Sequence, residues 1–394
     1  MITVIEIGMR SCFLLLFLFL GAFAKAADST NEDVTIRVGD IDRTAIVHLP
    51  QLPDDGSTPK LPVVLNLHAL GMNSEMLQEV CQLDDLADKE NFIAVYPNGH
   101  SVAGIFPKAN KVPLFSRKSL MSRILRKETK FLSNMRSWNG GGCCPQACNN
   151  AIDEIGFFRK LVEYIQTDMA EEHGFAVDAE RIYVMGVSNG GFMTYRVACE
   201  MSDIVAAVSP IAGVLSHTEK QVEVFDGDPF KCPSENQRPI PVLHMHCKGD
   251  PIVPPDGLNS WVFIGQGDKR LPTVNSSLAE FREINGVTDS DGVVVYDDSD
   301  SRWFPNPLRL FRPPSTKCIS YGDDTDFPVE YCEINKSGPL AHCYPGEGPI
   351  GKFCGNRIGN EYIWKFFKKY TLSKGEKNDS SEDTVLSSQR DNEL

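Results

Sequence analysis

The stretch that decides the fold reads Tyr183-Val184-Met185-Gly186-Val187-Ser188-Asn189-Gly190-Gly191. It is an apolar run that ends in the pattern G-x-S-x-G and continues into helix-forming residues. This pattern indicates a serine on a tight turn between a strand and a helix, flanked by glycines because larger side chains would collide there. A serine exposed in this way can attack a carbonyl carbon, so the stretch predicts acyl transfer through Ser188.

Apolar runs and helical patterns alternate along the rest of the chain. An opening hairpin is predicted at 34–38 and 44–49, and a helix-like stretch at 75–89. Further strands are predicted at 62–67, 92–96, 182–185, 205–209, 241–246 and 329–334, and further helices at 152–169 and 191–199. Strands that are apolar throughout suit a parallel sheet covered on both faces. The sequence therefore predicts an α/β fold with a mostly parallel, doubly wound sheet and helices on both faces.

A serine nucleophile needs a base, and the base needs an orienting carboxylate. α/β-Hydrolases supply these groups in the chain order Ser, then Asp or Glu, then His. Asp250 follows a predicted strand, at the end where α/β sheets place functional groups, although it could simply shape the turn before Pro251. His342 is the only histidine downstream of Asp250, so a triad in this order must use it.

An acyl-transfer site also needs backbone N–H groups that hold the oxyanion. The candidates are Asn189, directly after the nucleophile, and a residue of the loop 68–73 after a predicted strand. His244 and His246 lie on one face of a predicted strand and could suggest a metal pair. A third ligand of obvious kind is missing, which favours hydrogen-bonded core histidines. We expect neither a metal nor a cofactor.

The first residues have the composition of a secretory signal peptide. Arg10 precedes an apolar run at 12–20 and then small residues, which predicts a signal peptide over 1–26, cut after Ala24 or Ala26. The run is shorter than the roughly 20 residues that cross a bilayer, and no later stretch comes close. We expect a soluble, secreted protein without a transmembrane segment.

Cysteine usage agrees with export. Eleven of the twelve cysteines follow the predicted signal peptide, and their odd number leaves one thiol over. The sequence does not settle the connectivity, although Cys318 with Cys332 and Cys343 with Cys354 are plausible pairs. No C-x-x-C pairs at ligand spacing support a zinc site. Sequons that would permit glycosylation in a eukaryotic source begin at Asn275, Asn335 and Asn378.

The net charge of -14 argues against a nucleic-acid binder. After the predicted signal peptide, residues 27–372 are expected to form the catalytic domain. Within it, 108–136 reads as a basic amphipathic insertion that either packs on the surface or serves as a lid or a docking surface for an anionic substrate or membrane. The polar tail at 373–394 should be disordered. Its final Glu-Leu matches an endoplasmic-reticulum retrieval signal only partly, so a frayed terminus is favoured.

The assembled motifs resemble the secreted polyhydroxybutyrate depolymerase and feruloyl esterase group of α/β-hydrolases, among the esterase D-related carbohydrate esterases. The resemblance runs from about Val34 to Tyr370. It is carried by Tyr96-Pro97-Asn98-Gly99, by Ser137-Trp138-Asn139-Gly140-Gly141-Gly142-Cys143-Cys144 with Ile152-Asp153-Glu154-Ile155-Gly156-Phe157, by Gly186-Val187-Ser188-Asn189-Gly190-Gly191, by Leu243-His244-Met245-His246 with Gly249-Asp250-Pro251-Ile252-Val253-Pro254, by His342-Cys343-Tyr344-Pro345-Gly346 and by Ile363-Trp364-Lys365-Phe366-Phe367.

The resemblance implies a role for each candidate. Ser188 would be the nucleophile, Asp250 the orienting acid and His342 the general base, in agreement with the order of the residues. Trp138 and Asn139 would contact substrate beside the cleft, although a structural tryptophan is an equal alternative. Ala69 stands where the family usually has glycine, and Leu70, next in line, is the expected second oxyanion donor.

The expected function is hydrolysis of carboxylic esters through an acyl-enzyme, without a cofactor. Feruloyl or acetyl esters on plant or algal cell-wall polysaccharide are the favoured substrates, and hydroxyalkanoate polyesters are the alternative. A catalytically silent fold that binds a polysaccharide or a partner is the alternative of another class. A serine peptidase is disfavoured, because no gating domain precedes the predicted core.

Overall fold

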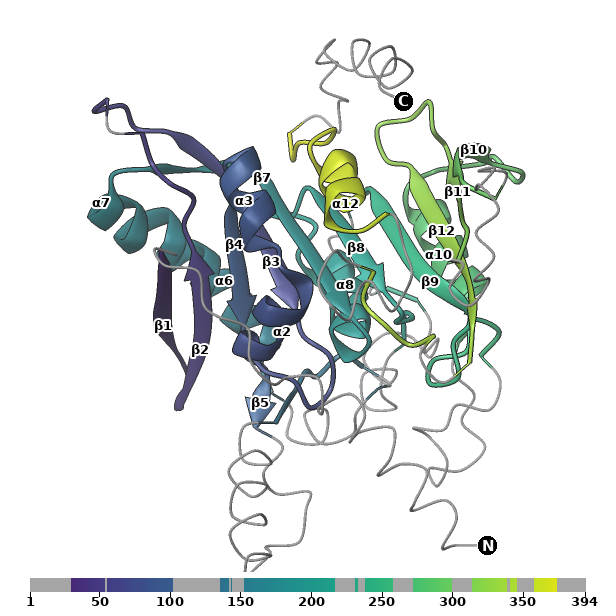
Figure 1. The fold of residues 1–394 in the computed structure, drawn as a ribbon, viewed down its shortest axis with the longest axis horizontal. Helices are drawn as coiled ribbons and strands as arrows, with labels where there is room; N and C mark the ends of the chain where they lie inside the picture. Colours follow the sequence, from purple (N-terminus) through teal and green to yellow (C-terminus); the bar gives the residue numbers. More distant parts are fainter. Residues whose placement is uncertain are drawn as a thin grey trace, which may run out of the picture.

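The structure of this 394-residue chain is a computed structural model that describes residues 30–53, 55–101, 135–141, 143, 152–216, 231–232, 238–257, 272–299, 314–338, 341–345 and 358–373 (Figure 1). The predicted signal peptide, all but the last two residues of the basic segment 108–136, and all but the first residue of the tail lie outside these ranges. Among the helices that the structure describes, none is both long enough and apolar enough to cross a membrane.

Ten strands of the described chain form one sheet. Its spatial order is β1 (Asn31–Val38), β2 (Ile41–His48), β4 (Ile93–Pro97), β3 (Lys60–Leu67), β7 (Ala176–Val187), β8 (Ala207–Ile211), β9 (Val242–Gly249), β12 (Val329–Ser337), β11 (Thr316–Tyr321) and β10 (Val293–Asp297). The strands from β4 to β12 are parallel to one another, and the two edges are antiparallel hairpins. The short strands β5 (His100–Ser101) and β6 (Arg136–Ser137) form a separate pair.

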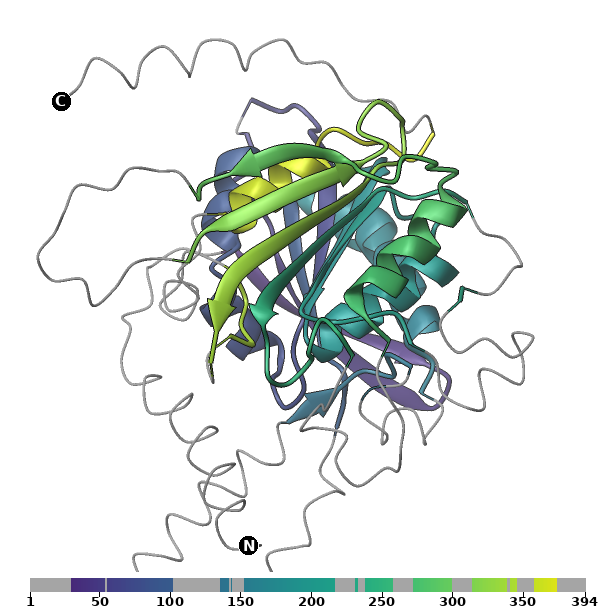
Figure 2. The same cartoon turned by 90° about the vertical axis from the view of Figure 1, so that its right-hand side faces the viewer.

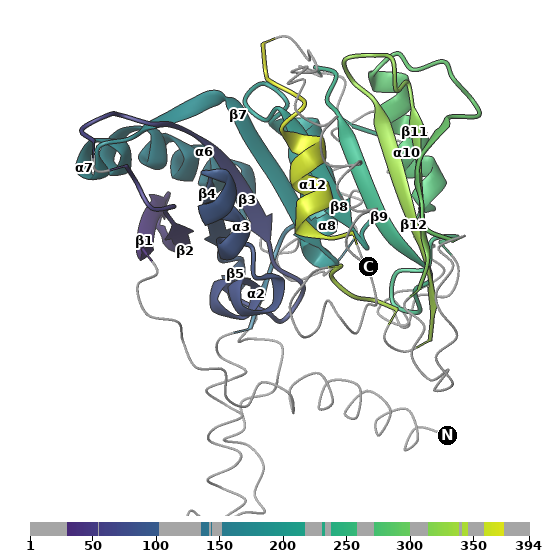
Figure 3. The same ribbon diagram turned by 45° about the horizontal axis from the view of Figure 1, so that its top comes forward.

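Helices cover both faces of this sheet (Figure 2). One face carries α2 (Ser74–Cys81), α3 (Asp84–Glu90) and α12 (Asn360–Phe367), which lie in front of the strands in Figure 3. The other face carries α6 (Glu154–Tyr164), the π-helical turn η2 (Ile165–Met169), α7 (Ala170–His173), α8 (Asn189–Glu200) and α10 (Val274–Ile284). This arrangement confirms the predicted mostly parallel, doubly wound α/β-hydrolase fold.

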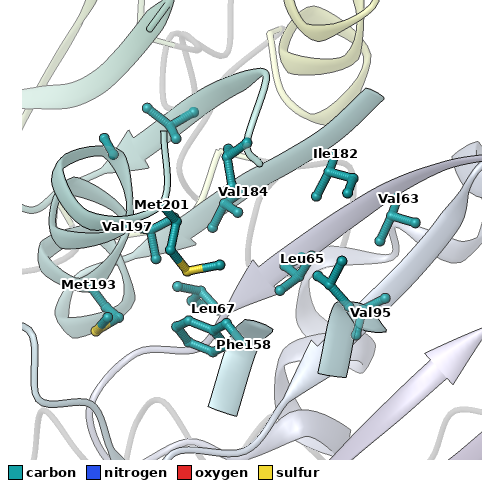
Figure 4. Close-up of a cluster of buried hydrophobic side chains, with 14 of the residues drawn as sticks. Val63, Leu65, Leu67, Val95, Phe158, Ile182, Val184, Met193, Val197 and Met201 are labelled. Atoms are coloured by element: carbon teal, nitrogen blue, oxygen red, sulfur yellow. The ribbon is translucent and has the colours of Figure 1, made fainter. Parts of the chain in front are cut away.

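Alternate residues of the central strands feed two separate cores. On β3, Val63, Leu65 and Leu67 face the α6 and α8 side, where they meet Phe158 and Val184 (Figure 4). Val64 of the same strand belongs to the opposite core, beneath α2, α3 and α12. A strand buried on both faces must be apolar throughout, which is why these strands could be predicted from apolar runs in the sequence.

Several elements differ from their predictions. The single helix expected at 75–89 is two helices, because Gln82 adopts a left-handed conformation (φ 48°) and its N–H closes α2 on the Gln78 carbonyl. The helix α10 and the strands β10 and β11 were not predicted. The sequence of α10 begins Val274-Asn275-Ser276-Ser277, which has weak helix propensity, and its N-cap Thr273 accepts a hydrogen bond from the Ser276 N–H.

Candidate active site

Ser188 forms the junction between β7 and α8. Its backbone has φ 56° and ψ -119°, a conformation that non-glycine residues rarely adopt, and its N–H donates to the Ile211 carbonyl at 2.8 Å. A Cβ atom on Gly186 would stand 2.6 Å from the Gly190 carbonyl oxygen, and one on Gly190 would overlap the Leu67 carbonyl oxygen. Both glycines are therefore required by close backbone packing, which explains the G-x-S-x-G pattern.

The structure brings together the three residues predicted to form the triad. The His342 Nε2 atom lies 2.7 Å from the Ser188 Oγ atom, and the His342 Nδ1 atom lies 2.7 Å from the Asp250 Oδ2 atom. Ser188 follows β7, Asp250 follows β9 and His342 follows β12, so all three come from the carboxyl ends of parallel strands. This geometry permits proton transfer from the serine to an oriented imidazole.

Asp250 is buried and held by hydrogen bonds on both carboxylate oxygens. Its Oδ1 atom accepts from the Ile252 and Val253 N–H groups at 2.8 and 2.9 Å, and its Oδ2 atom faces His342. Burial raises the pKa of this carboxyl, but the His342 charge and the hydrogen bonds from His246 and His342 outweigh burial and hold the pKa well below its usual range. Asp250 is thus a fixed negative charge next to the imidazole.

The loop after β3 is held in one conformation by its neighbours. The His68 Nδ1–H donates to the Ala69 carbonyl at 2.8 Å, while the Gly99 N–H donates to His68 Nε2 at 3.0 Å. Burial lowers the pKa of His68 to about 3, so the ring is neutral. Gly71 has φ 82° and donates its N–H to the Arg136 carbonyl, whereas Ala69 is not among the residues with positive φ. The alanine in place of the usual glycine is therefore unstrained, and Leu70 lies between these two residues.

Trp138 braces this loop from inside the protein. Its side chain is fully buried, and its indole N–H donates to the His68 carbonyl at 3.0 Å. The Asn189 side chain pairs with the Trp138 backbone in both directions, at 2.7 and 3.1 Å. Because the indole has no exposed surface, the geometry fits the structural alternative for Trp138 and gives the expected substrate wall no support. The bracing role of the Asn189 side chain was not recognised in the sequence.

Asn139 lies in a buried polar network. Its N–H donates to Glu154 at 3.2 Å, and its carbonyl accepts from Arg196 at 2.7 Å. Glu154 is fully buried and pairs with Arg43 at 2.6 Å. Asn139 itself is only 7% exposed, so its contacts join the active-site region to the core and do not support the expected contact with substrate.

His244 and His246 form one buried hydrogen-bonded chain with Tyr195. The Tyr195 hydroxyl lies 2.8 Å from His244 Nδ1, His244 Nε2 lies 3.0 Å from His246 Nδ1, and His246 Nε2 lies 2.8 Å from the Val253 carbonyl oxygen. Each ring nitrogen thus has a hydrogen-bond partner, which is the arrangement that the sequence favoured over a metal pair. Elsewhere in the described chain, one cluster has ligand-like spacing, Cys318, Glu330 and Cys332, but its two cysteines are bonded to each other.

Disulfides are present, and their pattern corrects one prediction. Cys318–Cys332 is the predicted bridge, and Cys199–Cys232 is a second that was not predicted. Cys343 is also disulfide-bonded, while its expected partner Cys354 lies outside the described residues. Among the described cysteines two are free, Cys81 and Cys247, so more than the one expected thiol is left unpaired. Both are buried, and burial raises the pKa of each thiol to about 12, so both are unreactive.

Comparisons with known proteins give the chain its relatives. A scan of protein-family models finds no match. Feruloyl esterase B of Piromyces equi is 31% identical over 238 residues, which cover 60% of this chain and 34% of that protein. A bifunctional acetylxylan esterase/xylanase of Neocallimastix patriciarum is 23% identical over 195 residues, which cover 50% of this chain and 20% of that protein. The chain is similar in sequence to part of each of these two proteins.

The chain spans about a third of the length of the first protein and a fifth of the second. The similarity confirms the feruloyl esterase side of the expected resemblance, and the depolymerase side stays an expectation. Among solved structures, the acetyl xylan esterase from Aspergillus awamori matches with a TM-score of 0.48 at 12% identity, over 83% of this chain and 98% of that one.

Proposed function

We propose that the protein is a serine carboxylic-ester hydrolase. The observation that carries the proposal is the hydrogen-bonded series Ser188–His342–Asp250, with 2.7 Å at both steps, built on a serine whose backbone is held at φ 56°. The relationship to two esterases supports the same reaction class.

The proposed reaction follows from the position of each group. The Ser188 Oγ atom attacks the ester carbonyl carbon while His342 Nε2 takes its proton, and Asp250 holds the imidazole through Nδ1. The backbone N–H groups of Asn189 and Leu70 are assigned to the oxyanion. The His342 imidazolium then gives its proton to the departing alcohol, which leaves an acyl group on Ser188. Water activated by His342 releases the acid and restores the serine.

The proposed substrates are feruloyl or acetyl esters on plant or algal cell-wall polysaccharide. This assignment rests on what the relatives are called, a feruloyl esterase and an acetylxylan esterase. Hydroxyalkanoate esters are the alternative, because the same triad would cleave them. These substrates differ on the acyl side, and on the alcohol side they carry a sugar hydroxyl in one case and a hydroxy acid in the other.

We also propose that the protein is secreted. The support is the signal-like composition of residues 1–26 and the presence of disulfides such as Cys199–Cys232 and Cys318–Cys332, which persist in oxidising compartments. The predicted sequon residues Asn275 and Asn335 are both exposed, as acceptance of a glycan would require.

Hydrolysis of a small ester panel tests the function. Purified wild type, Ser188→Ala and Ser209→Ala are assayed on p-nitrophenyl acetate, methyl ferulate and a hydroxybutyrate oligomer. Ser209 is the matched control, because its buried hydroxyl on β8 has no hydrogen-bond partner among the described residues. We expect turnover by the wild type and Ser209→Ala and none by Ser188→Ala, and the preferred ester names the substrate class. Equal turnover by all three proteins would reject Ser188 as the nucleophile, and no turnover by the wild type would reject the proposal and favour a silent binding fold.

A further inference from the structure

A chain of buried polar side chains lies behind the Asp250 carboxylate. It begins at Tyr195 on α8, continues through His244 and His246 on β9, and ends on two acceptors. The His246 Nε2 atom lies 2.8 Å from the Val253 carbonyl oxygen and 3.4 Å from the Asp250 Oδ2 atom. The three side chains are at most 1% exposed, so bulk water does not reach the chain.

The acceptors at its end fix the direction of the hydrogen bonds. A carbonyl oxygen only accepts, so His246 Nε2 carries a hydrogen. In the uncharged chain His246 Nδ1 then accepts from His244 Nε2–H, and His244 Nδ1 accepts from the Tyr195 hydroxyl. Burial lowers the pKa of His244 well below its usual value, which keeps that ring neutral. Every donor in the chain therefore points toward the Asp250 turn.

The turn at 250–253 also holds the Asp250 carboxylate by hydrogen bonds. The Val253 N–H donates to Asp250 Oδ1 at 2.9 Å, while the Val253 carbonyl accepts from His246, so this one residue is held from both sides. The remaining oxygen, Oδ2, faces His246 and His342. Fixing the 250–253 turn thus fixes which carboxylate oxygen meets the imidazole of His342.

If these residues only filled space, apolar side chains would do so at a lower cost in free energy. Burial of two imidazoles and a phenol destabilises the fold unless their hydrogen bonds are made. The titratable neighbour on another element is Tyr331 of β12, whose ring centre is 5.7 Å from that of His244. On β9 itself the neighbour is Cys247, a buried thiol whose pKa is raised by burial and by Asp250. Neither ends the chain, whereas Asp250 does.

We propose that Tyr195, His244 and His246 are positioning residues for the acid of the triad, acting on His342 through Asp250. The inference rests on the proposed function and adds to it a set of groups that touch neither the ester nor the reacting serine. It assigns the H-x-H pattern on β9 a purpose in the reaction.

The test compares variants that differ in one donor. His246→Leu removes the donor to Asp250 and Val253, and His246→Gln returns an N–H to that position. Tyr195→Phe removes only the hydroxyl at the start of the chain. Tyr183→Phe is the matched control, because the Tyr183 hydroxyl is equally buried and also makes one 2.8 Å hydrogen bond, to the Tyr370 carbonyl. Fluorophosphonate titration of Ser188 counts the competent sites in each preparation.

We expect His246→Leu to lower kcat per competent site by about tenfold to a hundredfold, with KM nearly unchanged, as loss of a hydrogen bond to a charged group predicts. The acid limb of its kcat/KM profile should move to higher pH, because Asp250 with one donor fewer holds the protonated His342 more tightly. His246→Gln should recover most of both changes. Tyr195→Phe should lose about threefold in kcat, and Tyr183→Phe none.

Unchanged kcat and pH profile in folded His246→Leu and Tyr195→Phe would overturn the inference. The inference would also be overturned if total activity fell only in proportion to the number of competent sites, with kcat per site unchanged. That result would mean that the residues have only a structural role. A wild type without Ser188-dependent turnover would instead reject the proposed function. NMR titration of the His342 ring in wild type and His246→Leu, without substrate, then decides the positioning role independently, since an identical titration in both would reject it.

Discussion

The backbone of Gly190 on α8 lies against the Leu67 carbonyl at the end of β3, so closely that any side chain on Gly190 would overlap it. This contact joins the helix that follows the serine to the strand that precedes the oxyanion loop. The two halves of the candidate site are therefore set by one backbone contact between adjacent strand ends.

Gly190→Ala should damage both stability and activity. The added methyl group must separate α8 from β3, which we expect to cost about 3 kcal/mol of unfolding free energy and most of the turnover. Chemical denaturation and ester assays measure the two effects. Gly39→Ala is the control, because Gly39 has φ 55° but open space around it, so only the backbone penalty of about 1 kcal/mol applies and activity should persist. Equal effects of the two substitutions would contradict the packing argument.

Strain at Ser188 should be measurable without any assay of turnover. Both Ser188→Ala and Ser188→Gly remove the hydroxyl, but only glycine adopts φ 56° freely. We expect Ser188→Gly to unfold at a higher temperature than Ser188→Ala, by an amount that corresponds to about 1 kcal/mol. A lower melting temperature for the glycine variant would show that the turn is not strained.

Trp138→Phe should lower both kcat and stability, since the lost indole N–H holds the His68 carbonyl beside the oxyanion loop. We expect a loss of about 1 to 3 kcal/mol in unfolding free energy and of about tenfold in kcat. Trp364→Phe is the control, because the indole N–H of Trp364 on α12 donates a comparable hydrogen bond to Glu90 at 2.7 Å, in the core on the opposite face of the sheet. That control should lose stability and retain kcat, and the reverse outcome would remove Trp138 from the loop argument.

Acid should destabilise the protein through His68. Its pKa is about 3 in the folded state and 6.5 in the reference state, so between these values the unfolded chain binds more protons and stability falls as pH falls. We expect His68→Gln to lose this contribution, which amounts to about 1.4 kcal/mol per pH unit. Urea unfolding of both proteins at pH 7, 5 and 4 measures the difference in slope. Parallel curves would mean that His68 titrates normally in the fold.

The sequence was informative where one physical requirement dominated. The central strands are buried on both faces, so their apolar runs predicted a parallel sheet, and close packing around Gly186 and Gly190 left a readable pattern. The triad residues could be named because a serine, an acid and a base must follow one order at strand ends, and the structure places the three named residues within hydrogen-bonding distance.

Other features depended on tertiary contacts that leave no local pattern. The exposed valines of β10 at the sheet edge lack the burial that marks a strand, and the break at Gln82 comes from one left-handed residue. The burial of Trp138 could not be read from residue type, because tryptophans line clefts and cores alike. Likewise, the pairing of the Asn189 amide with the Trp138 backbone joins residues 51 positions apart.

The placement of His342 after β12 also bears on synthesis of the chain. Ser188 and its glycine contacts need only β3, β7 and β8, whereas Asp250 requires β9 and His342 requires β12, which docks beside β9. On the proposed function, a nascent chain that has emerged only as far as β9 carries the serine without its base. Hydrolytic competence would then arrive with the last parallel strand, and the growing polypeptide would stay inert toward esters until β12 has docked.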